Sequence, residues 1–524
     1  LPVARDFAPD LVIVSAGFDS VRGDPLGGMD LTPIGYAHIL HHLRTLADGR
    51  MLVVLEGGYN HEMSAATAAK CVRVLRGERP KRLEGLGKVK ESVRESTMNT
   101  VSCLLPHWPS LRQYDSEAFR KRYPTASMSR FEPPERDIPT ANIDQADLLK
   151  PESIDIPVAP RSYATRVFHS GPAHHGHAHP DGNSFERPER ITTCLERLAT
   201  MRVPVDTVEV GEDEIDEDTV LRWINAVHDE EYVERLRSTR EMSSDEKPST
   251  VAQRLLGSDD SFITAGTWTA AIAAVATTIK AVDGVLSGSL SSAFSLVRPP
   301  GHHCGRGARG ASGFCFVNNV AVAAKYLLAR LPAASSRVLI IDWDVHLGDG
   351  TVACLASIDI DRLQYLSVHR SDDGTFFPAG ASHQGDRRSH VLLPLSGGAM
   401  TDAEYLAAID RIIMPVVYSY APSFILVSAG FDCLKGDPLG GYSVSPCTLA
   451  TLTRHLQAVA PVVAVLEGGY NGQSTAEGVA AVVEAMQGEA GKSGDKRGRL
   501  NPAASLTISD LAAKVQDRFD MVVG

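Results

Sequence analysis

Three features are missing from this sequence of 524 residues, and each absence argues against a class of protein. The eight cysteines form no Cys-x-x-Cys pair, which favours reduced thiols in a cytosolic or nuclear compartment over a disulfide framework. The net charge is −12 and no basic tract is long enough to grip a phosphate backbone, so we expect no direct binding of nucleic acid. The apolar runs fall short of a membrane span, so we expect no association with a membrane.

The composition is that of a large globular protein. Hydrophobic residues make up 43% of the chain and charged residues 22%. The length exceeds what one hydrophobic core supports and predicts two or three domains. The negative net charge would attract peptides with lysine-rich segments. The chain begins at Leu1 inside what reads as folded sequence, so we expect a fragment, in which the absence of a signal peptide carries little weight.

An internal repeat divides the chain. The series DLVIVSAGFD at 10–19, RGDPLGG and MLVVLEGGYN at 51–60 returns as SFILVSAGFD at 423–432, KGDPLGG and VVAVLEGGYN at 462–471. This repeat indicates a duplicated domain whose first copy keeps only its C-terminal third. We therefore predict an incomplete first domain at 1–105, a linker at 106–160, a complete domain at 161–488, and a flexible segment with a last helix at 489–524.

Strand-like runs alternate with helical segments in the second copy. The runs lie at 293–297, 338–341, 364–368, 424–427 and 462–466. This alternation predicts an α/β fold with a mainly parallel sheet and helices on both of its faces.

Other segments of the second copy give less regular patterns. We expect a helix over 184–198 and an Ala- and Thr-rich helix pair over 260–286. The His-rich patch at 174–179 has no strand to fix it, so it predicts a mobile loop at the rim more than a metal site. A last helix with Leu511, Val515, Phe519 and Val522 on one face should dock on the domain or on a partner.

The stretch RVLIIDWDVHLGDGT at 337–351 combines a buried strand with residue types that bind metals. Residues 338–341 read as a strand buried on both faces, and Asp342, Asp344 and His346 should point to one side as the chain leaves the sheet. Ligands gather at that edge of open α/β sheets. One histidine with carboxylates suits catalytic zinc or a similar ion better than calcium. The spacing alone is equally compatible with a capped, solvated loop.

Three further segments end apolar strands with reactive residues. They are RPPGHH with His302 and His303, followed by GFCFVNN; GFD with Asp432; and EGGYN with Tyr470. A single buried histidine is more often a satisfied core residue. Four strand ends that together supply Asp, His and Tyr favour one shared catalytic site.

This combination resembles the zinc-dependent histone deacetylases, and within them the class II members with two catalytic domains in tandem. The motifs RPPGHH, GFC-x-x-NN, D-x-D-V-H, SAGFD, GDPLGG and EGGYN carry the resemblance, which covers nearly the whole chain. It implies an arginase-like α/β fold around an eight-stranded parallel sheet. It also implies a cytoplasmic or nuclear hydrolase that removes acetyl groups from lysine side chains of proteins, such as histones or tubulin, with co-regulator complexes as partners.

The resemblance assigns the centre of the site residue by residue. The zinc ligands would be Asp344, His346 and Asp432, with water in the open position. Two adjacent histidines, His302 and His303, would handle protons. Asp342 and Asp349 would orient these histidines, and the hydroxyl of Tyr470 would donate to the acetyl oxygen.

The resemblance also assigns the substrate tunnel and a second ion. Phe314 and Phe377 would wall the tunnel, Gly313 would accept the scissile N–H, and Asp260 would hold the substrate backbone. A structural K⁺ would lie among Asp342, Asp344, His346, Ser367 and Val368, bound mostly through backbone oxygens.

Four positions bear on the detail of this resemblance. Leu347 stands where family members commonly have a second His, so we expect a changed pocket floor. Phe185-Glu186-Arg187 stands where family members have His-Pro-Glu, so the resemblance does not determine the structure of the pocket rim. Tyr470 is retained, whereas relatives with weak activity on acetyl-lysine carry His there. Leu439 stands where polyamine-deacetylating relatives place Glu, which favours a protein substrate.

Other interpretations stay open. Hydrolysis of acetylpolyamines or of longer acyl-lysines would use the same residues. A scaffold that holds acetylated partners without cleaving them fits the first copy, where Asp19 and Tyr59 survive without the rest of the site. A binuclear manganese ureohydrolase shares the fold but needs additional bridging aspartates that the sequence does not supply.

Overall fold

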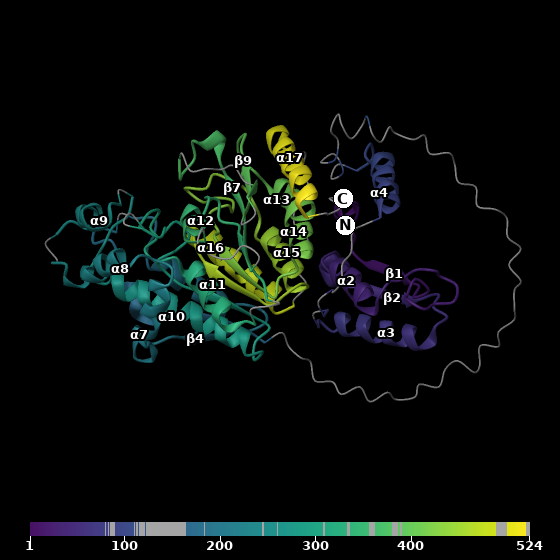
Figure 1. Ribbon diagram of the computed structural model, residues 1–524, viewed down its shortest axis with the longest axis horizontal. Helices are drawn as coiled ribbons and strands as arrows, with labels where there is room; N and C mark the ends of the chain where they lie inside the picture. Colours follow the sequence, from purple (N-terminus) through teal and green to yellow (C-terminus); the bar gives the residue numbers. More distant parts are fainter. Residues whose placement is uncertain are drawn as a thin grey trace, which may run out of the picture.

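The computed structural model contains two folded parts that follow the internal repeat (Figure 1). It describes residues 1–108 without 79, 82 and 84–89; residues 111, 114 and 121; and residues 164–519 without 183, 244–245, 259, 308–309, 333–335, 356–361, 380–385, 388–389 and 489–499. Most of the predicted linker at 106–160 and of the predicted flexible segment after 488 therefore lies outside the described residues.

The second part is built on a sheet with the strand order β4-β3-β5-β11-β10-β6-β7-β9-β8. Eight of these strands pair in parallel, and the two-residue strand β8 pairs antiparallel to β9 at one edge. The predicted eight-stranded, mainly parallel sheet is confirmed. The strands are β3 (Thr165–His169), β4 (Asp206–Glu209), β5 (Ser292–Leu296), β6 (Val338–Asp342), β7 (Leu363–Arg370), β8 (Asp386–Arg387), β9 (His390–Leu395), β10 (Phe424–Ala429) and β11 (Val462–Leu466).

Helices cover both faces of this sheet. One face packs against α6 (Glu189–Ala199), α13 (Asp402–Ala408), α14 (Met414–Tyr420), α15 (Pro446–Gln457), α16 (Gly472–Met486) and α17 (Pro502–Phe519). The other packs against α10 (Thr267–Leu286) and α11 (Asn319–Arg330). The same core continues into α7 (Glu217–Asn225), α8 (Glu230–Arg237), α9 (Pro248–Leu256) and α12 (Asp349–Leu355). The π-helical turn η8 (Ile409–Ile413) joins α13 to α14.

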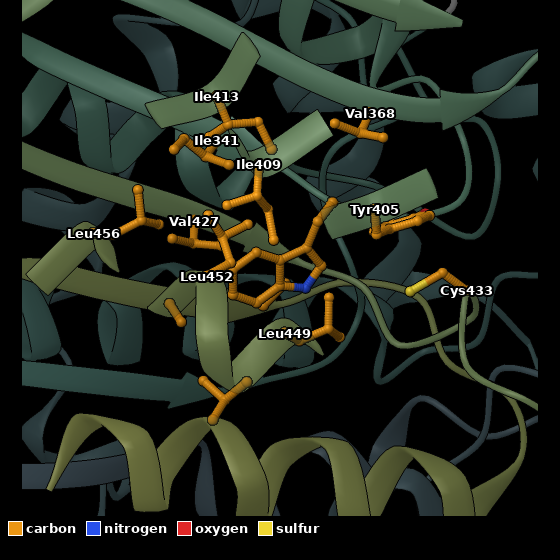
Figure 2. Packing of buried hydrophobic residues seen from close by; sticks show 14 of the residues in the cluster. Ile341, Val368, Tyr405, Ile409, Ile413, Val427, Cys433, Leu449, Leu452 and Leu456 are labelled. Carbon is orange, nitrogen blue, oxygen red and sulfur yellow. The ribbon is translucent and has the colours of Figure 1, made fainter. Parts of the chain in front are cut away.

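The central strand β6 shows why its sequence is apolar throughout. Val338 and Ile340 lie in the core on one face of the sheet, and Leu339 and Ile341 lie in the core on the other. A strand with helices on both faces buries every side chain, so its hydrophobic run is continuous instead of alternating. Figure 2 shows Ile341 and Val427 of β10 packed among the side chains of η8 and α15.

Two predictions about helices need correction. The expected helix pair over 260–286 is one helix, α10, and residues 260–266 precede it without helical structure. This helix is also long and apolar enough to cross a membrane, contrary to the expectation that no run is. Most of its residues are buried in the domain, so α10 is a core helix.

The last helix docks on the complete domain. Ala504, Ile508, Leu511 and Val515 of α17 are buried in the same core as α13 and α14. The alternative of a face reserved for a partner is wrong for these residues, because the domain itself covers them.

The first part repeats a fragment of this architecture. It contains α1 (Pro2–Phe7), β1 (Val12–Ala16), α2 (Pro33–Leu43), β2 (Met51–Leu55), α3 (His61–Leu75) and α4 (Glu91–Leu104). β1 and β2 form a parallel pair that corresponds to β10 and β11. Among the described residues this pair has no further strand beside it.

Candidate metal centre

The reactive side chains lie where three neighbouring strands end. Asp344 and His346 follow β6, Asp432 follows β10, and Tyr470 follows β11. β10 pairs with β6 on one side and with β11 on the other, and all three run parallel. Their carboxyl ends therefore meet at one edge, where open α/β sheets bind ligands.

The structure brings the three predicted metal ligands together. Asp344, His346 and Asp432 are buried, and one potential ligand atom from each lies within 4.8 Å of the other two. His346 Nδ1 lies 3.0 Å from Asp344 Oδ1 and 3.0 Å from Asp432 Oδ2. One nitrogen and two carboxylate oxygens facing each other in this way suit a zinc site with an open coordination position. The alternative of a solvated loop is wrong, because none of the three is exposed.

Backbone N–H groups hold the two carboxylates in place. Asp432 Oδ1 accepts from Val345 N at 2.8 Å, and Asp344 accepts from His346 N at 2.9 Å and from Gly468 N at 2.8 Å. Such support fixes the direction in which a ligand presents its oxygen.

The ionisation of the triad is consistent with a site for a cation. Burial and the charge of Asp344 raise the pKa of Asp432 to about 7. Burial opposes protonation of His346, but hydrogen bonds to Asp344 and Asp432 outweigh it and raise the pKa of His346 to about 9. The two carboxylates therefore favour a positive charge between them. In the absence of a metal this charge is the proton on His346, and a bound cation would take its place.

The histidine pair lies beside this triad. His302 Nδ1 is 3.1 Å from Asp342 Oδ2, and His303 Nδ1 is 2.8 Å from Asp349 Oδ1. The two imidazole centroids are 4.0 Å apart. Each carboxylate accepts from Nδ1 and leaves Nε2 as the nitrogen for proton transfer. His302 Nε2 is 3.7 Å from Asp344 Oδ1, so the pair adjoins the predicted metal ligands.

The environment shifts the pKa values of the two histidines in opposite directions. Burial opposes the charged form of His302, but Asp344 and Asp342 outweigh it and raise the pKa of His302 well above its usual value. Burial and the charge of His302 lower the pKa of His303 to about 4. Two titratable groups whose pKa values are pushed apart in this way can act as an acid and a base side by side.

Tyr470 completes the site as a protonated phenol. Burial raises the pKa of Tyr470 well above its usual value, so its hydroxyl keeps the proton that a hydrogen-bond donor needs. Asp437 fixes the backbone at this point by accepting from Tyr470 N at 2.7 Å. The Arg190 guanidinium lies 5.0 Å from the centroid of the Tyr470 ring.

A buried ionic network that the sequence did not predict lies behind Tyr470. Glu186 is fully buried and pairs with Arg298 of the RPPGHH segment, with Nε to Oε1 at 2.8 Å, and with Arg190 at 3.3 Å. Arg190 Nε also donates to Gly469 O at 2.6 Å. Glu186 therefore connects the segment that carries the histidines to the segment that carries Tyr470. The sequence left the rim at Phe185-Glu186-Arg187 undetermined, and the Glu186 side chain is inaccessible to solvent, so it does not line the rim.

The His-rich patch also differs from its prediction. His174 and His177 are buried, and the His177 ring stacks on Phe262 with centroids 4.5 Å apart. The patch at 174–179 is therefore held partly in the core beside Glu186, and the prediction of a mobile rim loop is wrong for these two residues.

Gly313 and Phe314 form a strained turn against the histidines. Their φ angles are +54° and +66°, a region that favours glycine. A Cβ at Gly313 would collide with the His303 ring, so only glycine fits there. Asp260 accepts from Gly313 N at 3.0 Å and from Ser258 Oγ at 2.9 Å. It therefore holds this turn, and its predicted contact with the substrate backbone stays a prediction.

Aromatic rings border the site on more than one side. Phe314 contacts Tyr470 with centroids 5.6 Å apart, and Phe377 contacts His303 at 5.0 Å. Phe376, which the sequence did not single out, stacks on His346 at 5.1 Å. Leu439 is half-buried in the loop after β10. Leu347 is buried in the hydrophobic core.

Comparisons with known proteins show the family of this chain. The family model for the histone deacetylase domain matches residues 1–75 and 184–486. The chain belongs to the class II histone deacetylase family. It is 39% identical over 505 residues to Histone deacetylase 6 of Caenorhabditis elegans, an alignment that covers 93% of this chain and 52% of the relative.

Two further similarities extend this result. The chain is 36% identical over 315 residues to human Polyamine deacetylase HDAC10, which covers 58% of this chain and 45% of that protein. The crystal structure of the HDA15 HD domain aligns with a TM-score of 0.58 and 27% identity, over 68% of this chain and 96% of that one. The chain spans about half the length, or less, of these curated deacetylases.

Proposed function

We propose that the complete copy at 161–488 is a zinc-dependent hydrolase that removes acetyl groups from lysine side chains of proteins. The observation that carries this proposal is the convergence of a buried Asp-His-Asp triad with a protonated tyrosine and a carboxylate-bound histidine pair. Zinc held by Asp344, His346 and Asp432 would activate a water molecule and polarise the acetyl carbonyl.

The other side chains have separate tasks in this mechanism. One of His302 and His303 removes a proton from the attacking water, and one protonates the departing lysine amine. Tyr470 donates its hydroxyl to the acetyl oxygen as negative charge develops there. Gly313 accepts the N–H of the scissile amide through its carbonyl. Phe314 and Phe377 sandwich the lysine methylenes, which are apolar and gain from contact with aromatic faces.

Leu439 supports a protein substrate over an acetylpolyamine. A polyamine carries a second ammonium group, and an apolar side chain at the rim offers it no charge partner. Similarity to a relative named as a polyamine deacetylase supports acetylpolyamine hydrolysis as the second candidate function. Rates of acetate release from an acetyl-lysine peptide and from acetylspermidine decide between them. We expect the peptide to react faster, and faster reaction of acetylspermidine would overturn the protein-substrate assignment.

The remaining assignments belong to the same proposal. Residues 1–105 form the C-terminal part of a first deacetylase-like domain, and 106–160 link it to the complete one. A structural K⁺ would be held, mostly through backbone oxygens, among Asp342, Asp344, His346, Ser367 and Val368; Asp342 of β6 pairs with Ser367 of β7. The substrates are acetylated proteins such as histones or tubulin in the cytoplasm or nucleus, with co-regulator complexes as further partners. Acetyl-lysine binding without acetate release would favour the scaffold alternative.

A further inference from the structure

The two repeated copies contact each other through equivalent helices. His41 and His42 of α2 lie 413 residues before Arg454 and His455 of α15, which is the offset of the repeat itself. His41 Nε2 is 2.9 Å from Arg454 O, and His42 Nδ1 is 2.6 Å from His455 Nδ1. A residue that touches its own counterpart lies next to a local two-fold axis. Figure 1 shows α2 facing α14 and α15.

The contacts on either side of this axis are related in the same way. Arg5 of α1 and Tyr418 of α14 are also equivalent in the repeat. Arg5 Nη2 is 2.9 Å from His455 Nε2, and the Tyr418 hydroxyl contacts His42 Nε2. The helices that carry them end alike, at Ala8 and Ala421 with φ of 49° and 50°. The interface is therefore isologous, because each copy presents the same face.

We propose that this face, formed by α1 and α2 in one copy and by α14 and α15 in the other, docks two copies of the deacetylase fold on each other, and that the docking requires both central histidines to be uncharged. The partner that the face fits is a second deacetylase-like domain presenting the same helices. The proposal goes beyond the catalytic function and does not depend on it.

The direction of each hydrogen bond follows from one fixed donor. The Arg5 guanidinium can only donate, so His455 Nε2 must be an unprotonated acceptor. His455 then carries its proton on Nδ1 and donates to His42 Nδ1. His42 in turn carries its proton on Nε2 and donates to the Tyr418 oxygen. A second proton on either ring would place two donors against each other and break the chain of hydrogen bonds.

The surroundings oppose protonation as well. Titratable and charged groups from both copies surround the pair. The first copy contributes Arg5 of α1, His38 and His41 of α2, and Arg44 directly after α2. The complete copy contributes Asp410 of η8, Tyr418 of α14 and Arg454 of α15. The carboxylate of Asp410 accepts from Arg5 Nη1 at 3.0 Å through each of its oxygens. Burial and the neighbouring histidines lower the pKa of His42 to about 3, and burial and His42 lower the pKa of His455 well below its usual value.

The sign of the pH effect follows from these shifts. When the copies separate, both rings regain an ordinary pKa of 6.5 and take up protons below it, whereas the docked pair does not. Docking is therefore at full strength above that pH and weakens as the pH falls. At about pH 5 each histidine favours separation by roughly 30-fold, and the two together by roughly 1000-fold, relative to about pH 8.

Energy transfer between fluorophores on the two copies tests this proposal in the full chain. The labels go on as non-natural amino acids at two exposed positions, Leu26 in the first copy and Leu506 on α17. We expect the equilibrium constant for separation to rise below about pH 5.5 with about two protons per pH unit from His42 and His455. His41 adds to this slope, because burial at its contact with Arg454 O lowers its pKa to about 4 in the docked state. Near-ultraviolet circular dichroism checks that the complete domain stays folded over the same range.

Substitutions assign the slope to the pair. His42→Gln and His455→Gln can hydrogen-bond but cannot titrate, so each should lower the slope of the parent chain by about one proton. His61→Gln removes an exposed histidine of the first copy and should leave the slope unchanged. Either glutamine variant suffices if the other does not fold. Constant energy transfer from about pH 8 to about pH 5, or the same slope in both glutamine variants as in the parent chain, would overturn the proposal.

Discussion

The loop that follows β1 in the first copy and the loop that follows β10 in the complete copy are built from the same hydrogen bonds. Asp24 accepts from Leu26 N, Gly27 N, Tyr59 N and Asn60 N at 2.9, 3.0, 2.7 and 3.2 Å. Asp437 accepts from Leu439 N, Gly440 N, Tyr470 N and Asn471 N at 2.8, 3.0, 2.7 and 3.3 Å. The segment GDPLGG and its partner EGGYN therefore shape this loop locally, whatever surrounds them.

The two copies differ in what covers their strands. Ile13 of β1 and Leu52 of β2 are 63% and 52% exposed, whereas the equivalent Leu426 and Val463 are fully buried. In the complete copy β6 and β5 pair with the outer edges of β10 and β11, and helices close both faces. Local sequence thus sets half of a site, but the metal triad and the histidine pair need strands supplied from elsewhere in a domain.

The largest contrast should come from the two equivalent tyrosines. Tyr470→Phe removes the hydroxyl that donates to the developing oxyanion, so kcat should fall by about 100- to 1000-fold while zinc stays bound. Tyr59 is 53% exposed, and the sequence of residues 1–105 holds no counterpart of the RPPGHH segment, so Tyr59→Phe should leave kcat unchanged. Steady-state kinetics on an acetyl-lysine peptide, with metal analysis of each variant, measures this. Equal losses in both variants would contradict a site confined to the complete copy.

Substitutions of the two loop aspartates, Asp437 and Asp24, should differ in their effect on the stability of the complete domain. Asp437→Ala leaves four N–H groups without their charged acceptor, and those of Gly440 and Tyr470 are buried. The free energy of unfolding of the complete domain should therefore fall by about 3 kcal/mol. Asp24→Ala should leave the unfolding of that domain unchanged, because its loop belongs to the other copy. Denaturant unfolding, monitored by tryptophan fluorescence in chains that carry Trp108→Phe, reports on the complete domain, which holds the other three tryptophans, among them the buried Trp268 and Trp343. A similar loss in both variants would show that the copies unfold as one unit.

A pair of glycines should give the smallest of these effects. A Cβ at Gly468 would collide with Asp432 Oδ2, and a Cβ at Gly57 would collide with Asp19 Oδ2. Gly468→Ala should displace a metal ligand and weaken zinc binding about 10- to 100-fold. Gly57→Ala should not alter the affinity of the complete copy. Competition with a zinc-binding dye measures both, and unchanged affinity in Gly468→Ala would count against Asp432 as a ligand.

Elements with continuous apolar runs could be predicted from the sequence, and elements at the edges could not. β5, β6, β7, β10 and β11 are buried on both faces, which leaves a continuous run to read. β4 has the sequence DTVE and is mostly exposed, so tertiary pairing with β3 decides its structure. Ser261 and Asp260 hydrogen-bond to the turn at Gly313 and Phe314, which accounts for the start of α10 only at Thr267.

The candidate site divides in the same way. Asp344, His346, Asp432 and Tyr470 stand directly after apolar strands, so strand topology alone brings them together. Glu186 meets Arg298 across 112 residues of sequence, and no local pattern signals that pairing. The available signal was a cluster of charges in FERPERI at the start of an amphipathic helix, which reads equally well as a solvated surface.

Zinc content measured together with acetate release tests the central claim most directly. The parent chain and Asp19→Asn should each hold about one zinc ion and release acetate from an acetyl-lysine peptide, because the carboxylate of Asp432 completes the ligand set in both. Asp432→Asn should lose both the zinc and the release. Zinc and turnover retained in Asp432→Asn, or lost in Asp19→Asn, would contradict a metal centre formed by Asp344, His346 and Asp432.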